Sequence, residues 1–397
     1  MIKIEEKDPI GGAVLFVTSL QLGGIGGGCS ASQGYASALR ALFGSRVVTF
    51  SLDPKNTQTV NVESAAGVER RSPGKGIAEF LLKARGIGKA AQVALELIKE
   101  RRLALDLVFL DGSLAIGAAP EFVRHAPVIA IHHNYEPDYW RDSGAAFLQR
   151  TVMQEIAARA QRTAWSKATL NLVLSDQDRS VLERTLGPAP SSVTGIGITT
   201  VRIDERPNPS GRQPEHVAVT GNFNVPRSRR ALLDGLEKIS SHTPSPGFLF
   251  EFIVAGRGSS CASVAEAALA ARGHRLTIVE SPDDILKAIS DCSVYWNPSH
   301  HGSGVKVRNS DGLQSGHVLV IREENIAGYS GLPEWAVCAY GEAGDPYPAL
   351  CAAVSTVRRF GVEKSASQIR GLFESEFSMR ALSSRIASSL RQSRLTA

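Results

Sequence analysis

The residues best suited to chemistry stand in the segment "NPSHHGSGVKVRNSDG", residues 297–312. An apolar, strand-like run ends at its first residue, a Gly-Ser-Gly turn follows, and a helix is expected over residues 305–315. The free amides at the start of such a helix carry the positive end of its dipole and attract anions. A lysine ammonium beside them suits a diphosphate, and a carboxylate further along the helix can accept hydrogen bonds from a ribose diol. The residues predicted for this pocket are Ser303, Gly304, Val305, Lys306 and Asp311.

A purely structural interpretation of this segment stays open. In it, Lys306 and Arg308 lie on a solvated helix face, and Asp311 neutralises them. The two interpretations differ in whether the lysine has a ligand or only a neighbouring carboxylate as its partner.

Two further glycine turns follow predicted strands in the same half of the chain. "VTGNFNVPRSRR" places Arg227 just before a helix, and "FIVAGRGSS" ends a strand with Gly256 and Gly258 on either side of Arg257. A glycine after a strand is common, so neither turn identifies a site by itself. Three such turns in succession favour one binding edge, because the carboxyl ends of parallel strands meet at the same edge of a sheet.

The N-terminal half carries a glycine cluster, "LGGIGGGCSA", residues 22–31. Glycine loses more backbone entropy on folding than any other residue, so the cluster favours a close approach of a ligand. Gly26, Gly28 and Ala31 also satisfy G-x-G-x-x-A, and Asp53 ends the next strand as a ribose-binding acid would. A nicotinamide or flavin site therefore stays open, although "TSLQLGG" separates the strand from the fingerprint. A merely flexible loop is the third interpretation.

Polar residues also gather in "IAIHHNYEPDYW", residues 129–140, at the end of another predicted strand. Adjacent side chains on a strand point to opposite faces, so His132 and His133 are not expected to chelate one metal together. One ring should lie in the packing layer, and the other, taken as His133, should lie at the strand tip over a cleft. The alternative is that both rings are structural.

Composition narrows the class of partner. The chain has 397 residues, 43% of them hydrophobic, and 44 Lys and Arg against 39 Asp and Glu give a net charge of +5. This mild basicity suits anionic ligands or an acidic membrane surface, but scattered charge and 6% aromatic residues do not favour nucleic acid. The five cysteines form no C-x-x-C pair and are expected to be reduced and buried, which favours the cytoplasm. The polar N-terminus predicts no signal peptide, and no apolar run approaches membrane-spanning length.

Short apolar runs alternate with amphipathic segments on both sides of a polar stretch, residues 202–215, that is typical of a linker. This rhythm predicts an α/β fold of two tandem doubly wound, Rossmann-like domains, with a ligand cleft between them. The predicted domains are residues 1–200 and 201–372, followed by a C-terminal helix within 373–397. Strands are predicted over 13–17, 46–52, 105–110, 128–132, 170–174, 216–220, 249–255, 276–279, 294–297 and 318–321. Helices are predicted over 32–43, 89–101, 147–166, 229–240, 263–272, 283–291, 305–315 and 373–394, and a loop over 57–76.

The second half of the chain resembles the nucleotide-sugar domain of GT-B glycosyltransferases of the retaining family-four type. That family's segments run G-N/R…K/R-N/G…A-L, then a strand followed by G-x-G, then P-S…G-x-G-x-K…E-A…G-x-P-V-V. The matching residues here are Gly221, Asn222, Arg227, Ala231, Leu232, Gly256, Gly258, Pro298, Ser299, Gly302, Gly304, Lys306, Asp311, Gly316 and Val318. The glycine loop and "HHNYE" are similar to segments of the family's first domain, so the resemblance covers nearly the whole chain in order and spacing.

The chain departs from the family pattern at four positions. Asp311 stands where the family usually has Glu, and Ser303 or a neighbour replaces the first Glu of its paired-glutamate motif. His317 replaces the small or polar residue before P-V-V, and Leu319 replaces part of that segment. These departures are expected to affect contacts to the sugar more than contacts to the diphosphate.

The resemblance implies a retaining glycosyltransferase that moves a sugar from a nucleoside-diphosphate-sugar donor to a saccharide or lipid-linked saccharide, in bacterial surface polysaccharide assembly. No cofactor and no essential metal are expected, and the C-terminal helix should pack back toward the N-terminal domain. Charge on the leaving diphosphate would be stabilised by the helix start at Gly304, by Arg227 and by Lys306, while His133 would contact the transferred sugar. The backbone would approach the donor and its nucleobase at Gly26, Gly27, Gly256, Arg257 and Ser281.

Two other functions stay open at this point. One is an NAD- or FAD-dependent oxidoreductase that uses the N-terminal glycine loop, and the other is a catalytically inactive, saccharide-binding relative. For the glycosyltransferase, a cytoplasmic location with peripheral contact at the inner membrane face is expected.

Overall fold

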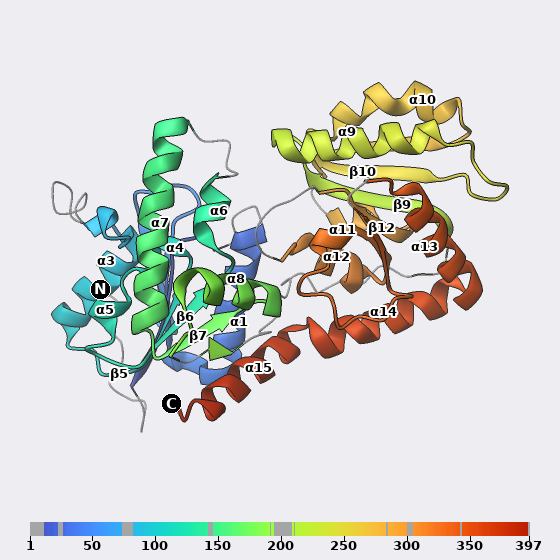
Figure 1. Ribbon diagram of the computed structural model, residues 1–397. Coiled ribbons are helices and arrows are strands. Elements are labelled where there is room, and N and C mark those ends of the chain that lie inside the picture. The colour runs from blue at the N-terminus through green and yellow to red at the C-terminus, as the bar shows by residue number, and fades with distance from the viewer. Residues whose placement is uncertain are drawn as a thin grey trace. The chain divides into compact units, whose positions relative to one another are not determined.

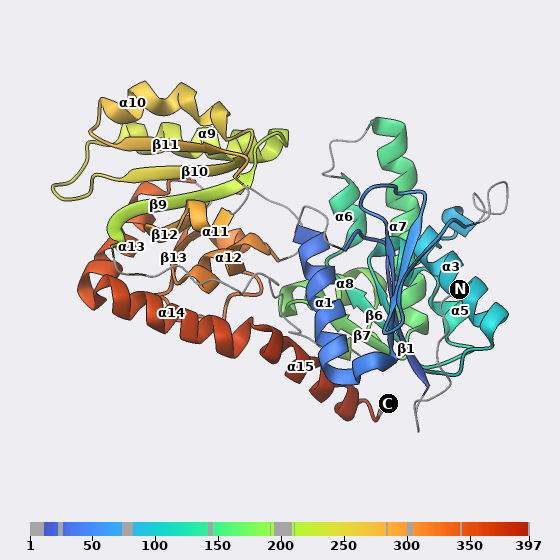
Figure 2. The same ribbon diagram turned by 180° about the vertical axis from the view of Figure 1, so that it is seen from behind.

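The computed structural model describes residues 12–22, 27–73, 82–141, 146–190, 192–193, 209, 211–282, 285–299, 305–341 and 344–395. Spatial contacts divide the chain into two compact units (Figures 1 and 2). The first takes Met1–Val201, Gly302–Val305 and Met379–Ala397, and the second takes Arg202–His301 and Lys306–Ser378. Each unit contains one largely parallel sheet with helices, which is the α/β arrangement expected from the alternating sequence pattern.

The first unit is built on an eight-stranded sheet with the strand order β4-β3-β2-β1-β5-β6-β7-β8. Neighbours pair in parallel from β2 to β8, whereas β3 and β4 form an antiparallel hairpin beside β2. The strands are β1 Ala13–Thr18, β2 Val47–Leu52, β3 Val60–Ser64, β4 Gly67–Arg71, β5 Leu105–Asp111, β6 Val128–His132, β7 Leu170–Val173 and β8 Ser192–Val193. The helices are α1 Gly27–Phe43, η1 Gly44–Arg46, α3 Lys89–Arg101, α4 Ser113–Ile116, α5 Ala119–Phe122, α6 Glu136–Arg141, α7 Phe147–Lys167, α8 Asp176–Leu186 and α15 Met379–Gln392.

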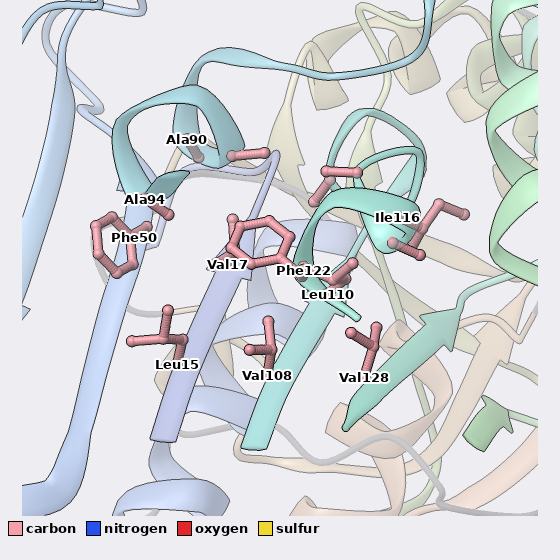
Figure 3. Close-up of a cluster of buried hydrophobic side chains, with 14 of the residues drawn as sticks. Leu15, Val17, Phe50, Ala90, Ala94, Val108, Leu110, Ile116, Phe122 and Val128 are labelled. Atoms are coloured by element: carbon pink, nitrogen blue, oxygen red, sulfur yellow. The ribbon is translucent and has the colours of Figure 1, made fainter. Parts of the chain in front are cut away.

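The core of this unit explains why its strands are apolar throughout. Alternate residues of a strand share a face, so Leu15 and Val17 of β1 lie beside Val108 and Leu110 of β5 (Figure 3). They pack against side chains from the helices on this face, including Ala90, Ala94, Ile116 and Phe122. The intervening positions, such as Phe16, are equally buried. Burial on both faces is the rule for parallel strands between two layers of helices.

The loop predicted over residues 57–76 is wrong, because the β3–β4 hairpin lies there. Val60 and Val62 are buried, but β4 is largely solvent-exposed, and Val68 is 62% exposed. An edge hairpin that buries so few side chains leaves only a short and weak alternation in the sequence.

The second unit has a six-stranded, all-parallel sheet with the order β11-β10-β9-β12-β13-β14. Its strands are β9 Gln213–Asn222, β10 Glu251–Arg257, β11 Arg275–Glu280, β12 Cys292–Asn297, β13 Val318–Arg322 and β14 Val337–Tyr340. Its helices are α9 Pro226–Ser241, η2 Ser259–Ala265, α10 Glu266–Ala270, α11 Ile285–Ala288, α12 Arg308–Ser315, η3 Glu323–Asn325, α13 Tyr347–Phe360 and α14 Val362–Glu376. The order reverses between β9 and β12, which is where such sheets bind their ligands, outside the carboxyl ends of the strands.

Several predicted boundaries differ from the structure. The linker ends sooner, since β9 begins at Gln213, and the helix predicted over 263–272 is a 3₁₀ segment followed by the short α10. The helix predicted over 305–315 begins only at Arg308. The single tail helix is in fact two, because α14 ends at Glu376 and α15 begins at Met379.

The C-terminal helix α15 packs on α1 within the first unit. Its Leu382, Ile386 and Leu390 are four residues apart and buried, whereas Arg380 and Arg391 are exposed. This one-sided pattern is the amphipathic helix that the sequence predicts.

None of the five cysteines forms a disulfide, and only Cys292 is buried, so the expectation of five buried thiols is wrong for the other four. Among the described residues, no helix is long and apolar enough to span a bilayer.

Two helical glycines give opposite predictions for stability. A Cβ at position 235 of α9 would lie 2.5 Å from Cζ2 of the buried Trp296, so Gly235→Ala should destabilise the protein by about 1–3 kcal/mol through overpacking. A Cβ at position 371 of α14 would meet no atom within 4 Å, so Gly371→Ala should stabilise by about 0.5–1 kcal/mol through helix propensity. Urea midpoints followed by circular dichroism measure both, and equal shifts for the two variants would contradict this packing of α9.

Candidate functional site

A buried carboxylate organises the carboxyl edge of the first sheet. Asp111, the last residue of β5, is wholly buried, and its Oδ2 accepts hydrogen bonds from Thr18 Oγ1 at 2.7 Å and from Ser32 Oγ. Its Oδ1 accepts a hydrogen bond from His133 Nε2 at 2.5 Å. A buried carboxylate is tolerated only with such partners, so the contacts fix β1, α1 and the end of β6 around one point.

The His133 ring next to this carboxylate favours its charged form. Burial lowers the pKa of His133, but the neighbouring Asp111 carboxylate, with Glu136 and Asp178 further off, outweighs burial and raises that pKa above 6.5. Because Nε2 donates to Asp111, Nδ1 is the ring atom left for a ligand. An imidazolium so held can donate a hydrogen bond to a sugar hydroxyl or to an anionic oxygen.

Polar groups from three helices surround His133. Tyr35 of α1 meets the ring edge-on at 5.8 Å, and its buried hydroxyl has no hydrogen-bond partner among the described residues. Glu136 of α6 is buried, which raises the pKa of its carboxyl group, although the charge of His133 lowers it in part. Asp178, in the first turn of α8, accepts a hydrogen bond from Ser175 Oγ at 2.6 Å. Hydroxyl and carboxyl groups in this density suit a ligand with many hydroxyls.

His132 points the other way, as alternation along a strand predicts. It is buried against Trp165, and its Nε2 lies 2.9 Å from Asn171 Oδ1. Burial lowers the pKa of His132 to about 4, so this ring is neutral at pH 7 and structural in role.

The glycines at the end of β10 are explained by backbone packing. Gly256 has φ +132°, and a Cβ there would lie 2.0 Å from the carbonyl oxygen of Gly221 at the end of β9. A Cβ at Gly258 would lie 2.5 Å from Asn224 Oδ1, and Phe223 N donates to Arg257 O at 2.7 Å. The side chain of Arg257 is exposed. These glycines therefore allow close backbone contact between the carboxyl ends of β9 and β10, and this packing does not require a ligand.

The amides that follow β10 are already occupied by Glu280. Its carboxylate accepts hydrogen bonds from Gly258 N at 2.6 Å and Ser260 N at 2.9 Å, and these bonds lower its pKa to about 2. Ser281, at φ +46°, joins the same turn by donating its N–H to Gly256 O at 3.1 Å. A diphosphate cannot use these amides while Glu280 holds them, so the turn can offer only its outer surface.

The segment after β12 is fixed through its backbone and through asparagine side chains. Lys306 O accepts from Tyr329 Oη and Asn309 N, both at 2.9 Å, and Asn297 Nδ2 donates to Asn309 Oδ1 at 2.7 Å. Arg308 Nη1 reaches Thr220 O at the end of β9, at 3.3 Å. Because α12 starts at Arg308, Lys306 stands before the helix rather than inside its first turn.

The structure brings together some of the residues predicted for the site. Val305 and Lys306 precede α12, and the half-buried Asp311 lies in its first turn. Gly256 and Ser281 are joined by the hydrogen bond from Ser281 N to Gly256 O. Arg227 lies exposed at the start of α9, and Gly27 is the first residue of α1. Three predicted residues lie outside the described part of the chain: Gly26, Ser303 and Gly304.

Sequence reasoning missed Asp111, the residue around which the first edge is organised. Its signal was the step "VFLDGS", in which an apolar strand ends in an acid followed by Gly and Ser. Asp53, proposed as a ribose-binding acid, is engaged inside the protein, because its carboxylate accepts from Lys55 N at 2.8 Å and pairs with Arg70 at 3.1 Å.

No family model and no curated protein matches the chain in sequence, but solved structures match its fold. Sucrose-phosphate synthase from Thermosynechococcus elongatus matches with a TM-score of 0.66 at 14% identity, over 96% of this chain and 98% of that one. The catalytic domain of starch synthase IV from Arabidopsis thaliana, bound to ADP and acarbose, matches at 0.64 and 12%, over 97% and 99%. Anabaena HepE in complex with UDP-glucose matches at 0.62 and 12%, over 96% and 100%. The likeness confirms the predicted fold class, two tandem doubly wound Rossmann-like domains of the GT-B type.

The two histidines should titrate far apart, and Asp111→Asn should move only one of them. In NMR spectra of histidine-labelled protein, His133 should titrate above pH 6.5 and His132 near pH 4. Asp111→Asn removes the charge that favours the imidazolium, so the pKa of His133 should fall while that of His132 stays. Asp106→Asn is the control, because Asp106 lies on the same strand as Asp111 and its substitution breaks only an ion pair with Arg46. An unchanged pKa of His133 in Asp111→Asn would contradict the proposed pairing.

These pKa values also set the sign of the stability change with pH. His133 has a raised pKa, so its contribution to stability is present below pH 6.5 and is lost as pH rises through its folded-state value. His132 has a lowered pKa, so its contribution is present above pH 6.5 and is lost as pH falls toward 4, by up to about 3 kcal/mol.

Proposed function

We propose that this protein is a retaining glycosyltransferase that takes its sugar from a nucleoside-diphosphate-sugar donor. The observation that carries the proposal is the basic carboxyl edge of the second sheet. Arg257 ends β10 there, Arg227 follows β9, and Lys306 and Arg308 follow β12. It occurs in a fold shared over nearly the whole chain with structures that contain ADP or UDP-glucose. Anions are the ligands that such an edge attracts.

Lys306 is the proposed partner of the leaving diphosphate. Its backbone is fixed by Tyr329 and Asn309, so the lysine side chain is anchored just before the start of α12. Arg227 is the proposed second cation, since it lies exposed at the start of α9. Asp311 would accept from the ribose, and the outer surface around Gly256, Arg257 and Ser281 would contact the nucleobase.

His133 is the proposed contact to the transferred sugar. Its raised pKa makes it a hydrogen-bond donor, and Asp111 holds the ring in one orientation. Gly26 and Gly27 are proposed to let the backbone approach the donor, and Ser303, Gly304 and Val305 to offer amides to the diphosphate.

The acceptor in this proposal is a saccharide or lipid-linked saccharide of a bacterial surface polysaccharide, and the site of action is the cytoplasm. Peripheral contact with an anionic membrane stays a prediction, which co-sedimentation with anionic and neutral vesicles tests.

The oxidoreductase alternative is less well supported. Its fingerprint needs an acid for the ribose, and the acid at the expected place, Asp53, is engaged by Lys55 N and Arg70. A catalytically inactive, saccharide-binding relative would bind a saccharide yet turn over no donor.

Thermal unfolding with nucleotides tests the proposal directly. A ligand that binds the native state raises the melting temperature, so UDP, GDP or ADP should raise it while CMP and NAD should not. A rise with NAD alone would favour the oxidoreductase, and no rise with any nucleotide would contradict a donor site.

Lys306→Ala and Asp311→Ala should differ in their kinetic effects. Charge on the diphosphate grows in the transition state, so Lys306→Ala should lower turnover by roughly a hundredfold, more than it weakens nucleotide binding. Asp311→Ala removes a contact made equally in both states, so the donor KM should rise with little change in turnover. Calorimetry of nucleoside-diphosphate binding, paired with donor-saturation kinetics, separates the two effects.

Lys364→Ala is the matched control, because it removes the same charge from an exposed position on α14. If Lys306→Ala binds and turns over like this control, the diphosphate site is misplaced and the lysine is only a surface partner of neighbouring carboxylates.

Metal independence is a separate prediction. The Asp-x-Asp triplet of the sequence, Asp176 to Asp178, opens α8, where Ser175 donates to Asp178, and the proposal assigns stabilisation of the leaving group to cationic side chains instead. Donor turnover should therefore persist in excess EDTA, and a complete loss that manganese or magnesium restores would overturn this part of the proposal.

A further inference from the structure

An arginine is buried just before β9 with most of its donors unused. Arg212 is only 4% exposed, and its Nη2 donates to Ser315 O at 2.9 Å. Its Nε and Nη1 atoms are buried and have no hydrogen-bond partner in the described part of the chain. Arginine is almost never buried without a paired group, because desolvating the charge is costly. A partner outside the described residues is therefore expected beside these two atoms.

A second arginine approaches the same carbonyl group. Arg370 of α14 donates Nη2 to Ser315 O at 3.1 Å, so two guanidinium groups share one acceptor. Burial, and then the charge of Arg370, lowers the pKa of Arg212 to about 10, while Cys292 and the exposed Asp291 offset this only in part. Two guanidinium groups beside one carbonyl concentrate positive charge, which is the condition that attracts an anion.

His317 adds a third polar group without a partner. The residue is wholly buried, and neither ring nitrogen has a hydrogen-bond partner among the residues described. Burial and the two arginines lower its pKa, whereas the Cys292 backbone beside the ring acts in the opposite direction without reaching hydrogen-bonding geometry. Ser315 Oγ, also buried, is likewise unpartnered. A neutral imidazole and a hydroxyl can each donate one hydrogen bond to an anion.

These groups lie at the amino ends of β9 and β13, away from Lys306. The helix α12 runs from the carboxyl edge of the sheet to this edge and ends in Gly316, whose φ is +85°. A Cβ at Gly316 would lie 2.8 Å from Ala366 O, so α14 packs directly on the turn between Ser315 and His317. The cluster is thus enclosed by α14, and solvent has little access to the orphaned donors.

We propose that Arg212, Arg370, Ser315 and His317 bind a small inorganic anion, a halide or an oxyanion such as phosphate or sulfate. The anion would accept the unused hydrogen bonds of Arg212, Ser315 and His317 and neutralise the buried Arg212 guanidinium. It would link the start of β9 and the α12–β13 turn to α14. This site is independent of the proposed donor site, because it lies at the opposite edge of the sheet and shares no residue with it.

Thermal unfolding in a series of anions tests the site. At constant ionic strength, chloride, sulfate or phosphate replacing gluconate should raise the melting temperature saturably, by roughly 3 °C at about 100 times the dissociation constant. Arg212→Met should lose the saturable rise and keep only the general salt effect. Arg275→Met, which removes the same charge from an exposed position of the same unit, should behave like the wild type.

Equal responses of Arg212→Met and the wild type, or no saturable response in either, would overturn the proposal. UDP, GDP and ADP responses measured on Arg212→Met keep this result separate from the donor site. A loss of both responses in a folded variant would contradict the claimed independence.

Crystals of the wild-type protein provide a measurement that does not depend on a variant folding. In bromide, an anomalous peak within hydrogen-bonding distance of Arg212 identifies a halide site. In phosphate, tetrahedral density there without a bromide peak identifies an oxyanion site. Ordinary water in both crystals would show that solvent satisfies the orphaned donors and would refute the proposal.

Discussion

The buried carboxylate of Asp111 is the constraint on which the first unit's candidate edge depends. Its two oxygens are satisfied by Thr18, Ser32 and His133, which belong to β1, α1 and the exit of β6. Thr18 and Ser32 share Oδ2, whereas His133 is the described donor to Oδ1, so removing His133 would leave a buried acceptor unpaired, at a cost of about 1–3 kcal/mol or more for a charged group. The need to satisfy this one group therefore fixes three chain segments together, and it gives His133 both its orientation and its raised pKa.

The second unit has the same kind of sheet, but among its described residues cationic side chains, rather than a buried carboxylate, lie at its carboxyl edge. At its carboxyl edge, the amides nearest β10 are already used by Glu280, so the proposed attraction for anions is assigned to cationic side chains. The backbone of Lys306 is held by Tyr329, and Arg308 reaches the end of β9. The glycines there serve close contact between neighbouring strand exits, as the approach of Gly256 to Gly221 shows. At the end of β10, the proposed binding of an anion therefore relies on charged side chains rather than on the amides that Glu280 occupies.

The elements that sequence predicted well are those with continuous apolar runs under two helical layers, such as β1, β6 and β12. The predicted bounds of α3 agree with the structure, because its apolar positions follow the helical period closely. The hairpin at Val60 and Val62 was missed because so few of its side chains are buried. Asp111 was missed for a different reason: a single acid at a strand end looks ordinary until the fold brings donors from distant segments to it. The burial of Arg212 without partners for Nε and Nη1 likewise follows from packing, so the sequence alone could not predict it.

The motif segment from Asn297 to Val318 shows why sequence neighbours need not share a site. An eight-residue helix rises about 12 Å, so α12 carries the chain from Lys306 at one edge of the sheet to His317 at the other. The expectation that a histidine at position 317 alters sugar contacts is therefore wrong, because that ring lies buried beside Arg212 and Arg370. Asp311, in the first turn of α12, remains at the edge where a ribose could reach it. Two departures from one sequence pattern thus have different physical meanings: one changes the length of a proposed ligand contact, and the other belongs to a buried cationic cluster that needs an anion.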